Sequence, residues 1–184
     1  LLPYWFRAIE THAPWVRKVH FVTWGHIPAF LNLGAPTLHI VRHEDFIPKA
    51  YLPTFSSHTI EMNIHRIPDL AEHFIYFNDD MFPVGDCRPE DFFRNGKPVI
   101  GYYRHLIASG MYKKICRNSD RLARKALGMK PSCFFTRPQH ICSPMLKSQC
   151  DELYAKVEDE IRKTSATRTR TEENLNQYLF LDYM

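Results

Sequence analysis

The run FIYFNDDMF, residues 74–82, is the feature that most restricts what this chain can fold into. Its apolar and aromatic residues, Phe74–Phe77, are typical of a buried strand, and Asn78, Asp79 and Asp80 follow them directly. A strand this apolar needs cover on both faces, as in the parallel sheet of an α/β domain. Ligands of such sheets bind where the strands end, so the sequence predicts that the two carboxylates lie at a binding cleft.

Strand-like and helix-like segments alternate through the first hundred residues. Apolar spacing and turn residues predict strands at 16–24, 37–43, 74–78 and 97–103, helices at 3–13, 54–67, 106–127, 143–163 and 171–184, and a loop at 128–142. The helix 143–163 carries the clearest apolar stripe, formed by Leu146, Cys150, Leu153, Val157 and Ile161. We therefore expect an α/β fold whose strands share a mostly parallel sheet, with a helical C-terminal part.

The composition is that of one globular domain. The chain has 184 residues, 45% of them hydrophobic, and its net charge of +4 suits anionic ligands such as nucleotides but is too small to indicate nucleic-acid binding. No apolar run approaches the ~20 residues of a membrane span. The five cysteines include no CxxC pair, so neither zinc nor a disulfide framework is indicated and a reducing compartment is expected. Because the chain opens on Leu1-Leu2 inside a predicted helix, we interpret it as a piece of a longer protein.

Asp79 and Asp80 are the first candidates for chemistry. Carboxylate oxygens are hard ligands that suit Mg²⁺ or Mn²⁺, and such an ion would offset the charge of a nucleotide's phosphates. Asn and Asp are also common turn residues, so a simple turn is the competing explanation. The pattern alone leaves both explanations open.

The predicted helix 54–67 carries a polar face. At spacings of three and four residues, His58, Glu61 and His65 fall on one side of the helix, and isoleucines fall on the other. The pattern alone favours a solvated face with a weak Glu–His pair. The helix directly precedes strand 74–78, however, and packing against that strand would turn the polar face toward the cleft at Asp79.

Two further candidates lie later in the chain. His140 stands in a loop before a long predicted helix, and an imidazole there could act as a general base because its pKa lies near working pH. Arg168 and Arg170 lie in a polar turn, where guanidinium groups suit phosphate recognition. Exposed side chains without a role are the competing explanation for all three residues.

The order of these segments resembles the Stealth family of sugar-1-phosphate transferases, which includes bacterial capsule enzymes and the animal N-acetylglucosamine-1-phosphotransferase. The run from APWVRKVHFVTWGHIPAFLN through HRIPDLAEHFIYFNDDMF resembles the family's second signature block, and His140–Met184, with KTSATRTRTEENLNQYLFLDY, resembles the third. Together they cover well over half of the chain, whereas 104–135 carries no usable resemblance.

The resemblance implies a nucleotide-sugar transferase fold (GT-A-like, Rossmann-like) and the transfer of a sugar-1-phosphate. The donor would be UDP-N-acetylglucosamine or a related nucleotide-sugar, the acceptor would be a polysaccharide hydroxyl, and UMP would be released. Asp79 and Asp80 fall on the family's NDD motif and would bind Mg²⁺ or Mn²⁺, with Asp80 also catalytic and Asn78 binding substrate.

The same resemblance assigns roles to residues outside this motif. His140 falls on the His that opens the third block and Arg170 on that block's Arg, and both would be catalytic. Glu61, His65 and Arg66 match the family's IExxxHRI pattern and would bind substrate. The arginine and the metal would offset charge on the phosphate oxygens, and His140 would orient or deprotonate the acceptor hydroxyl.

The chain also departs from the family pattern. The family's first and fourth blocks are absent, so residues 1–184 are expected to form one catalytic domain with an incomplete site, and Cys142 stands where the family usually has Pro. Two other functions stay open: an ordinary glycosyltransferase that releases UDP, and a non-catalytic module that binds anionic polymers through the basic stretch 113–125. The expected location is the bacterial cytoplasm, with peripheral membrane association left open.

Overall fold

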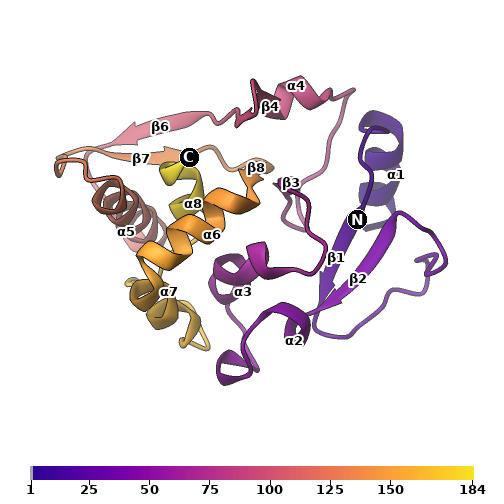
Figure 1. Cartoon of the computed structure of the whole chain (residues 1–184), viewed down its shortest axis with the longest axis horizontal. Helices are drawn as coiled ribbons and strands as arrows, with labels where there is room; N and C mark the ends of the chain where they lie inside the picture. Colours follow the sequence, from indigo (N-terminus) through magenta and orange to yellow (C-terminus); the bar gives the residue numbers. More distant parts are fainter. Residues whose placement is uncertain (1) are drawn as a thin grey trace.

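The structure, a computed structural model, describes residues 2–184 and is a mixed α/β fold in which short strands pair two by two among helices (Figure 1). The helices are α1 (Leu2–His12), α2 (His43–Phe46), α3 (Ser57–Asn63), α4 (Pro89–Phe92), α5 (Gly110–Ala126), α6 (Lys147–Lys156), α7 (Glu158–Ser165) and α8 (Tyr178–Tyr183), with 3-10 turns at Lys49–Tyr51 and Ile64–Arg66. The strands are β1 (Val19–Thr23), β2 (Leu38–Arg42), β3 (His73–Tyr76), β4 (Phe93–Arg94), β5 (Lys97–Pro98), β6 (Tyr102–His105), β7 (Phe135–Pro138) and β8 (Ser143–Leu146).

Two-stranded pairs take the place of the single sheet that the sequence predicts. Strands β1 and β2 are parallel, whereas β3–β8, β4–β5 and β6–β7 are antiparallel. The α/β class is therefore confirmed, but the mostly parallel sheet shared by all the predicted strands is wrong. The apolar pattern of a segment shows that it is a strand, but it does not show which strand lies beside it.

The predicted strand 97–103 is divided between two hairpins. Asn95 and Gly96 adopt left-handed backbone angles, with φ of 51° and 76°, and turn β4 back onto β5. An Asn-Gly pair in this conformation is the favoured two-residue hairpin turn, because both positions need a positive φ. Strand β6 then begins at Tyr102 and pairs with β7, which lies within the predicted loop 128–142.

Strand β3 pairs with a segment that the sequence predicts to be helical. The predicted helix 143–163 begins only at Lys147, and Ser143–Leu146 forms the fully buried strand β8. Glu72 explains this boundary: its backbone oxygen accepts a hydrogen bond from the Lys147 N–H at 2.8 Å, and its carboxylate accepts one from the Ser148 N–H at 3.1 Å. These contacts satisfy N–H groups of the first helical turn, which have no partner within the helix.

Strand β3 is also less buried than predicted. Phe74 is buried, but His73 is exposed and Ile75 and Tyr76 are half-buried. The prediction of a strand covered on both faces is wrong, because the face that carries His73 and Ile75 is only partly covered. In addition, β8 pairs with one edge of β3 and, within residues 2–184, no strand pairs with the other.

The core is one continuous apolar cluster that includes α8. Tyr178, Leu179, Phe180 and Leu181 are each at most 1% exposed, and α8 packs among α5, α6 and β7 (Figure 1). Each such side chain contributes about 1.5–3 kcal/mol on burial. The burial of the predicted stripe is confirmed, although Leu146 ends β8 and Val157 stands between α6 and α7. All its members are buried: Leu146, Cys150, Leu153, Val157 and Ile161.

The other predicted helices exist with changed bounds. Helix α1 matches the prediction, α5 begins four residues late, and α3 passes into a 3-10 turn before the chain reaches Pro68. Of the predicted helix 171–184 only α8 is helical. Among residues 2–184, no helix combines the length and the apolar character that crossing a membrane requires.

Candidate active site

The end of strand β3 presents polar side chains to solvent. The Tyr76 hydroxyl donates a hydrogen bond to Asn78 Oδ1 at 2.6 Å, and Asp79 and Asp80 follow with exposed side chains. Residues two apart in an extended strand share a face, which is why Tyr76 and Asn78 meet. The bond holds the Asn78 side chain at the point where the chain leaves the strand.

Helix α3 turns its polar face inward, so the interpretation of a solvated face is wrong. His58 and Glu61 are both buried. Glu61 Oε2 accepts a hydrogen bond at 3.0 Å from the Gln177 N–H, which joins α3 to the segment before α8. Burial raises the pKa of Glu61 to about 7, and burial lowers the pKa of His58 to about 4. Both shifts favour neutral side chains beneath the site.

Arg170 approaches the same helix from the loop after α7. The Phe55 N–H donates to the Arg168 backbone oxygen at 3.0 Å, which ties this loop to the start of α3. Arg170 Nη2 then donates to Ser57 Oγ at 2.8 Å. Its positive charge acts against the effect of burial on the pKa of Glu61. Arg170 thus combines an exposed guanidinium group with a fixed anchor on α3.

Tyr76 lies between these two groups of residues, and the sequence analysis missed it. Burial raises the pKa of the Tyr76 hydroxyl, and the negative charges of Glu61, Asp79 and Asp80 raise it further, while Arg170 lowers it. The charges of the predicted residues Glu61, Asp79, Asp80 and Arg170 therefore all act on one tyrosine hydroxyl. The signal was present in the sequence, since Tyr76 precedes Asn78 by two positions in a predicted strand.

A cavity of about 440 Å³ joins Asp80 to His140. Both residues line it, and the rest of the wall is mainly apolar, including Trp15, Ile75 and Phe77. Met81 and Phe82 are also part of this wall. The full set of lining residues is Ile9, Ala13, Trp15, Val16, Ile75, Phe77, Asp80, Met81, Phe82, Pro83, Val84, Cys87, Phe92, His140, Ile141 and Cys142. Residues from the second and third predicted blocks therefore face one space.

The donor atoms fit a divalent cation that binds together with a phosphate ligand. Mg²⁺ is commonly held by one or two carboxylates and substrate phosphates, and it keeps several of its waters. Asp79 and Asp80 supply two exposed carboxylates. In the described part of the chain, no three His, Cys, Asp or Glu side chains gather closely enough to hold a metal alone. The arrangement fits a shared site but not a closed protein site.

His65 and Arg66 lie in the 3-10 turn Ile64–Arg66 that follows α3. The His65 ring packs against Tyr154 and Phe180, with centroids 5.1 and 5.6 Å apart, and burial lowers its pKa to about 4. Arg66 is exposed and its guanidinium group lies over the Tyr154 ring at 5.8 Å. These contacts join the 3-10 turn to α6, and the predicted substrate-binding role of both residues stays a prediction.

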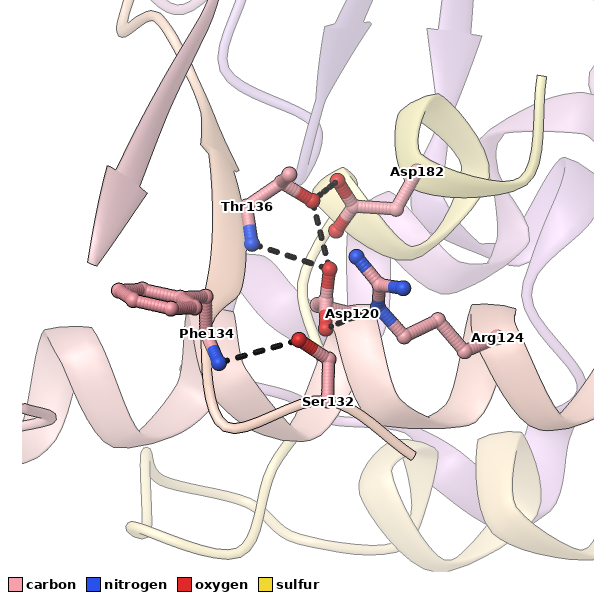
Figure 2. Close-up of polar contacts among 6 residues, drawn as sticks. All are labelled: Asp120, Arg124, Ser132, Phe134, Thr136 and Asp182. Carbon is pink, nitrogen blue, oxygen red and sulfur yellow. Dashed lines mark hydrogen bonds and ion pairs between the residues drawn. The ribbon is translucent and has the colours of Figure 1, made fainter. Parts of the chain in front are cut away.

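A second pair of carboxylates, Asp120 on α5 and Asp182 on α8, meets at Thr136, and the sequence did not single out these residues (Figure 2). Asp120 Oδ1 accepts hydrogen bonds from the Thr136 N–H at 3.0 Å and hydroxyl at 2.6 Å, and its Oδ2 accepts one from Arg124 Nε at 2.9 Å. Asp182 Oδ1 lies 3.0 Å from the Thr136 hydroxyl. Burial and the Asp120 charge raise the pKa of Asp182. This cluster joins α5, β7 and α8 within the fold.

Comparison with known proteins gives a family for this arrangement. The family model described as "Stealth protein CR2, conserved region 2" matches residues 1–100, which is more than half of the chain. The chain belongs to the Stealth family. The matched region includes α3, β3 and the Asn78–Asp80 segment of the site.

Named relatives of this Stealth chain are streptococcal. It is 35% identical to a capsular polysaccharide phosphotransferase, WcwK, of Streptococcus pneumoniae over 97% of the chain and 63% of the relative. It is 45% identical to a capsular polysaccharide phosphotransferase, eps5J, of Streptococcus thermophilus over 72% of the chain and 58% of the relative. It is 34% identical to a receptor polysaccharide phosphotransferase, WefC, of Streptococcus gordonii over 96% of the chain and 62% of the relative. The chain thus spans about three fifths of the length of these relatives.

Proposed function

We propose that this chain forms part of an enzyme that transfers a hexose-1-phosphate from a UDP-sugar to a polysaccharide hydroxyl during capsule or exopolysaccharide synthesis. The shared cavity of Asp80 and His140 is the observation that carries the proposal. The names of the streptococcal relatives support phosphotransfer to a polysaccharide. A GT-A-like layer is part of the same proposal, and the parallel β1–β2 pair supports it.

In the proposed reaction the acceptor oxygen attacks the phosphorus that bears the sugar. The new oxygen–phosphorus bond forms as the bond from that phosphorus to the bridging oxygen breaks, and UMP leaves with the electron pair of that bond. His140 takes the proton of the acceptor hydroxyl. Arg170, exposed and anchored on Ser57, binds phosphate oxygens and offsets their developing charge. The proposed donor sugar is N-acetylglucosamine.

The remaining site residues bind and orient the donor in this proposal. Asp79 and Asp80 would hold Mg²⁺ or Mn²⁺, which when bound neutralises diphosphate charge. Asn78, whose side chain is fixed by the Tyr76 hydroxyl, hydrogen-bonds the donor. Glu61, with a pKa raised by burial to about 7, is poised between its neutral and charged forms beside Ser57 and Arg170.

The competing binding function has less support. A module for anionic polymers would need free cations along 113–125, but three of the six cations there form ion pairs: Lys114 with Glu172, Arg124 with Asp120 and Lys125 with Glu160. Binding of this kind would also weaken steeply with salt. An ordinary glycosyltransferase would instead attack the sugar carbon and release UDP, so the nucleotide product separates the two enzymes.

The deciding experiment supplies UDP-N-acetylglucosamine, Mg²⁺ and an acceptor oligosaccharide to the full protein and identifies the nucleotide released. We expect UMP, whereas UDP would reassign the reaction. Asp79→Asn and Asp80→Asn, nearly isosteric, should each lower transfer about 100-fold or more, with partial rescue at higher Mg²⁺ or Mn²⁺. Asp159→Asn, an exposed carboxylate of α7, is the matched control and should leave transfer unchanged. Normal transfer by both site variants would show that the carboxylates only turn the chain.

A further inference from the structure

The buried hydroxyl group of Tyr178 connects His140 to helix α5. His140 Nδ1 lies 3.3 Å from the Tyr178 hydroxyl oxygen, and the same oxygen lies 2.9 Å from the hydroxyl of Tyr112. Tyr178 is 1% exposed, whereas Tyr112 is 46% exposed. The three side chains therefore form a continuous hydrogen-bonded chain that runs from the cavity, through the core, to solvent.

The geometry indicates which way the Tyr178 proton points. Burial raises the pKa of Tyr178, so the hydroxyl keeps its proton and needs an acceptor for it. A hydroxyl group has one proton to donate, and the contact with Tyr112 is 0.4 Å shorter than the contact with His140, as the distances above show. Tyr112 can accept this hydrogen bond because its half-exposed hydroxyl can give its own proton to water.

The direction of this bond decides the protonation of His140. If Tyr178 donates to Tyr112, the lone pairs of the Tyr178 oxygen face His140, and Nδ1 must carry a proton in order to donate to them. In neutral imidazole only one ring nitrogen carries a proton. Nε2 is then the nitrogen with a free lone pair on a side chain that lines the cavity beside Asp80.

We propose that Tyr178 is a positioning residue for His140, which it holds in the Nδ1–H tautomer so that Nε2 can accept the proton of the attacking hydroxyl. Tyr112 keeps the Tyr178 hydroxyl turned toward α5. Arg137 holds the Tyr112 ring, with its guanidinium carbon 5.9 Å from the ring centroid and 4.9 Å from that of Tyr103. The inference rests on the proposed function and adds α5, the segment without a recognised resemblance, to the same site.

The test uses two variants that remove one hydroxyl group each. Tyr178→Phe removes the acceptor of the Nδ1 proton. Tyr112→Phe leaves His140 and Tyr178 in place but removes the acceptor of the Tyr178 proton, which should turn toward Nδ1 and push the His140 proton to Nε2. Tyr103→Phe is the matched control: it also lies under Arg137, and its hydroxyl has no hydrogen-bond partner within residues 2–184.

Two measurements read the outcome in the full protein. Nitrogen-15 NMR of the His140 ring distinguishes the two tautomers, and steady-state kinetics of transfer separate kcat from KM. We expect the Nδ1–H tautomer in the unchanged protein and a shift toward Nε2–H in both variants. The kcat should fall about 10-fold or more, which is a part of the roughly 10²–10⁴-fold that a general base typically contributes, with KM nearly unchanged. Tyr103→Phe should change neither quantity.

The inference fails if His140 already carries its proton on Nε2, or if both variants leave the tautomer unchanged. It also fails if the tautomer shifts while kcat stays normal, because His140 would then not need the positioning. If the protein transfers no sugar-1-phosphate at all, the proposed function is wrong, and the positioning of His140 for that reaction is overturned with it even where NMR finds the Nδ1–H tautomer. A shifted tautomer together with a normal UMP-releasing reaction would overturn the inference alone.

Discussion

Replacing Glu61 by Gln should make the protein more stable at neutral and alkaline pH while it lowers activity. Burial raises the pKa of Glu61 from 4.5 to about 7, so the folded state binds a proton that the unfolded state releases between these values. The stability that this proton provides is fully present below pH 4.5 and is lost as the pH rises through 7. Integrated over that interval, the loss is about 3 kcal/mol.

The variant Glu61→Gln avoids this loss because an amide does not ionise in the range. The oxygen of the new amide can still accept the hydrogen bond from the Gln177 N–H, and its nitrogen can donate to Ser57. We therefore expect equal stability of both proteins near pH 4.5 and an advantage of up to about 3 kcal/mol for the variant at pH 8. Transfer should fall above about pH 7, where Glu61 of the unchanged protein is charged beside Arg170 and the amide of the variant is not.

Urea unfolding from pH 4 to pH 9 measures this difference directly. His58 and His65, whose pKa values burial lowers to about 4, add stability as the pH rises, but they do so in both proteins and cancel in the comparison. If the free energies of unfolding of the two proteins differ by the same amount at every pH, Glu61 ionises normally in the folded protein and the reasoning is refuted. A variant that is less stable throughout would show that the carboxylate supports the fold.

Two further predictions concern packing. Thr136→Val should destabilise the protein by about 1–3 kcal/mol in urea, because Asp120 and Asp182 lose their shared hydroxyl partner (Figure 2), whereas exposed Thr169→Val should cost little. Met145→Ala should cost about 2–5 kcal/mol because this β8 residue is fully buried, whereas exposed Met129→Ala should be near neutral. If Met145→Ala leaves the free energy of unfolding unchanged, the result favours a helix at 143–146, in which Met145 would stand outside the apolar stripe.

Most local elements could be predicted from the sequence, but their pairing could not. The apolar stripe from Leu146 to Ile161 and the strands β1, β2 and β3 follow from spacing alone. In a segment of four residues such as 143–146, the apolar spacing of a helix cannot be distinguished from that of a strand. The contacts of Glu72 set the start of α6 at Lys147. Such contacts between distant segments leave no local pattern.

The catalytic and binding roles assigned from the sequence stay predictions. The charges of Asp79, Asp80, Glu61 and Arg170 all act on one side chain, Tyr76, which looked like an ordinary strand aromatic. The polar face of α3 looked solvated because spacing shows which residues share a face but not whether the face is covered. Glu61 is covered by residues before α8, more than a hundred positions later.

The β3–β8 pair accounts for the meeting of the two site segments. Antiparallel register places Tyr76 opposite Ser143, so the chain leaves β3 toward Asp80 at the same end at which it enters β8 from His140. Each side chain is a few residues from this last pair, and both therefore reach one cavity. In a parallel sheet, His140 at the start of its strand would lie at the opposite end from Asp80. The antiparallel pairing, which departs from the predicted fold, is thus the feature that lets a carboxylate of one block and an imidazole of the other line the same cavity.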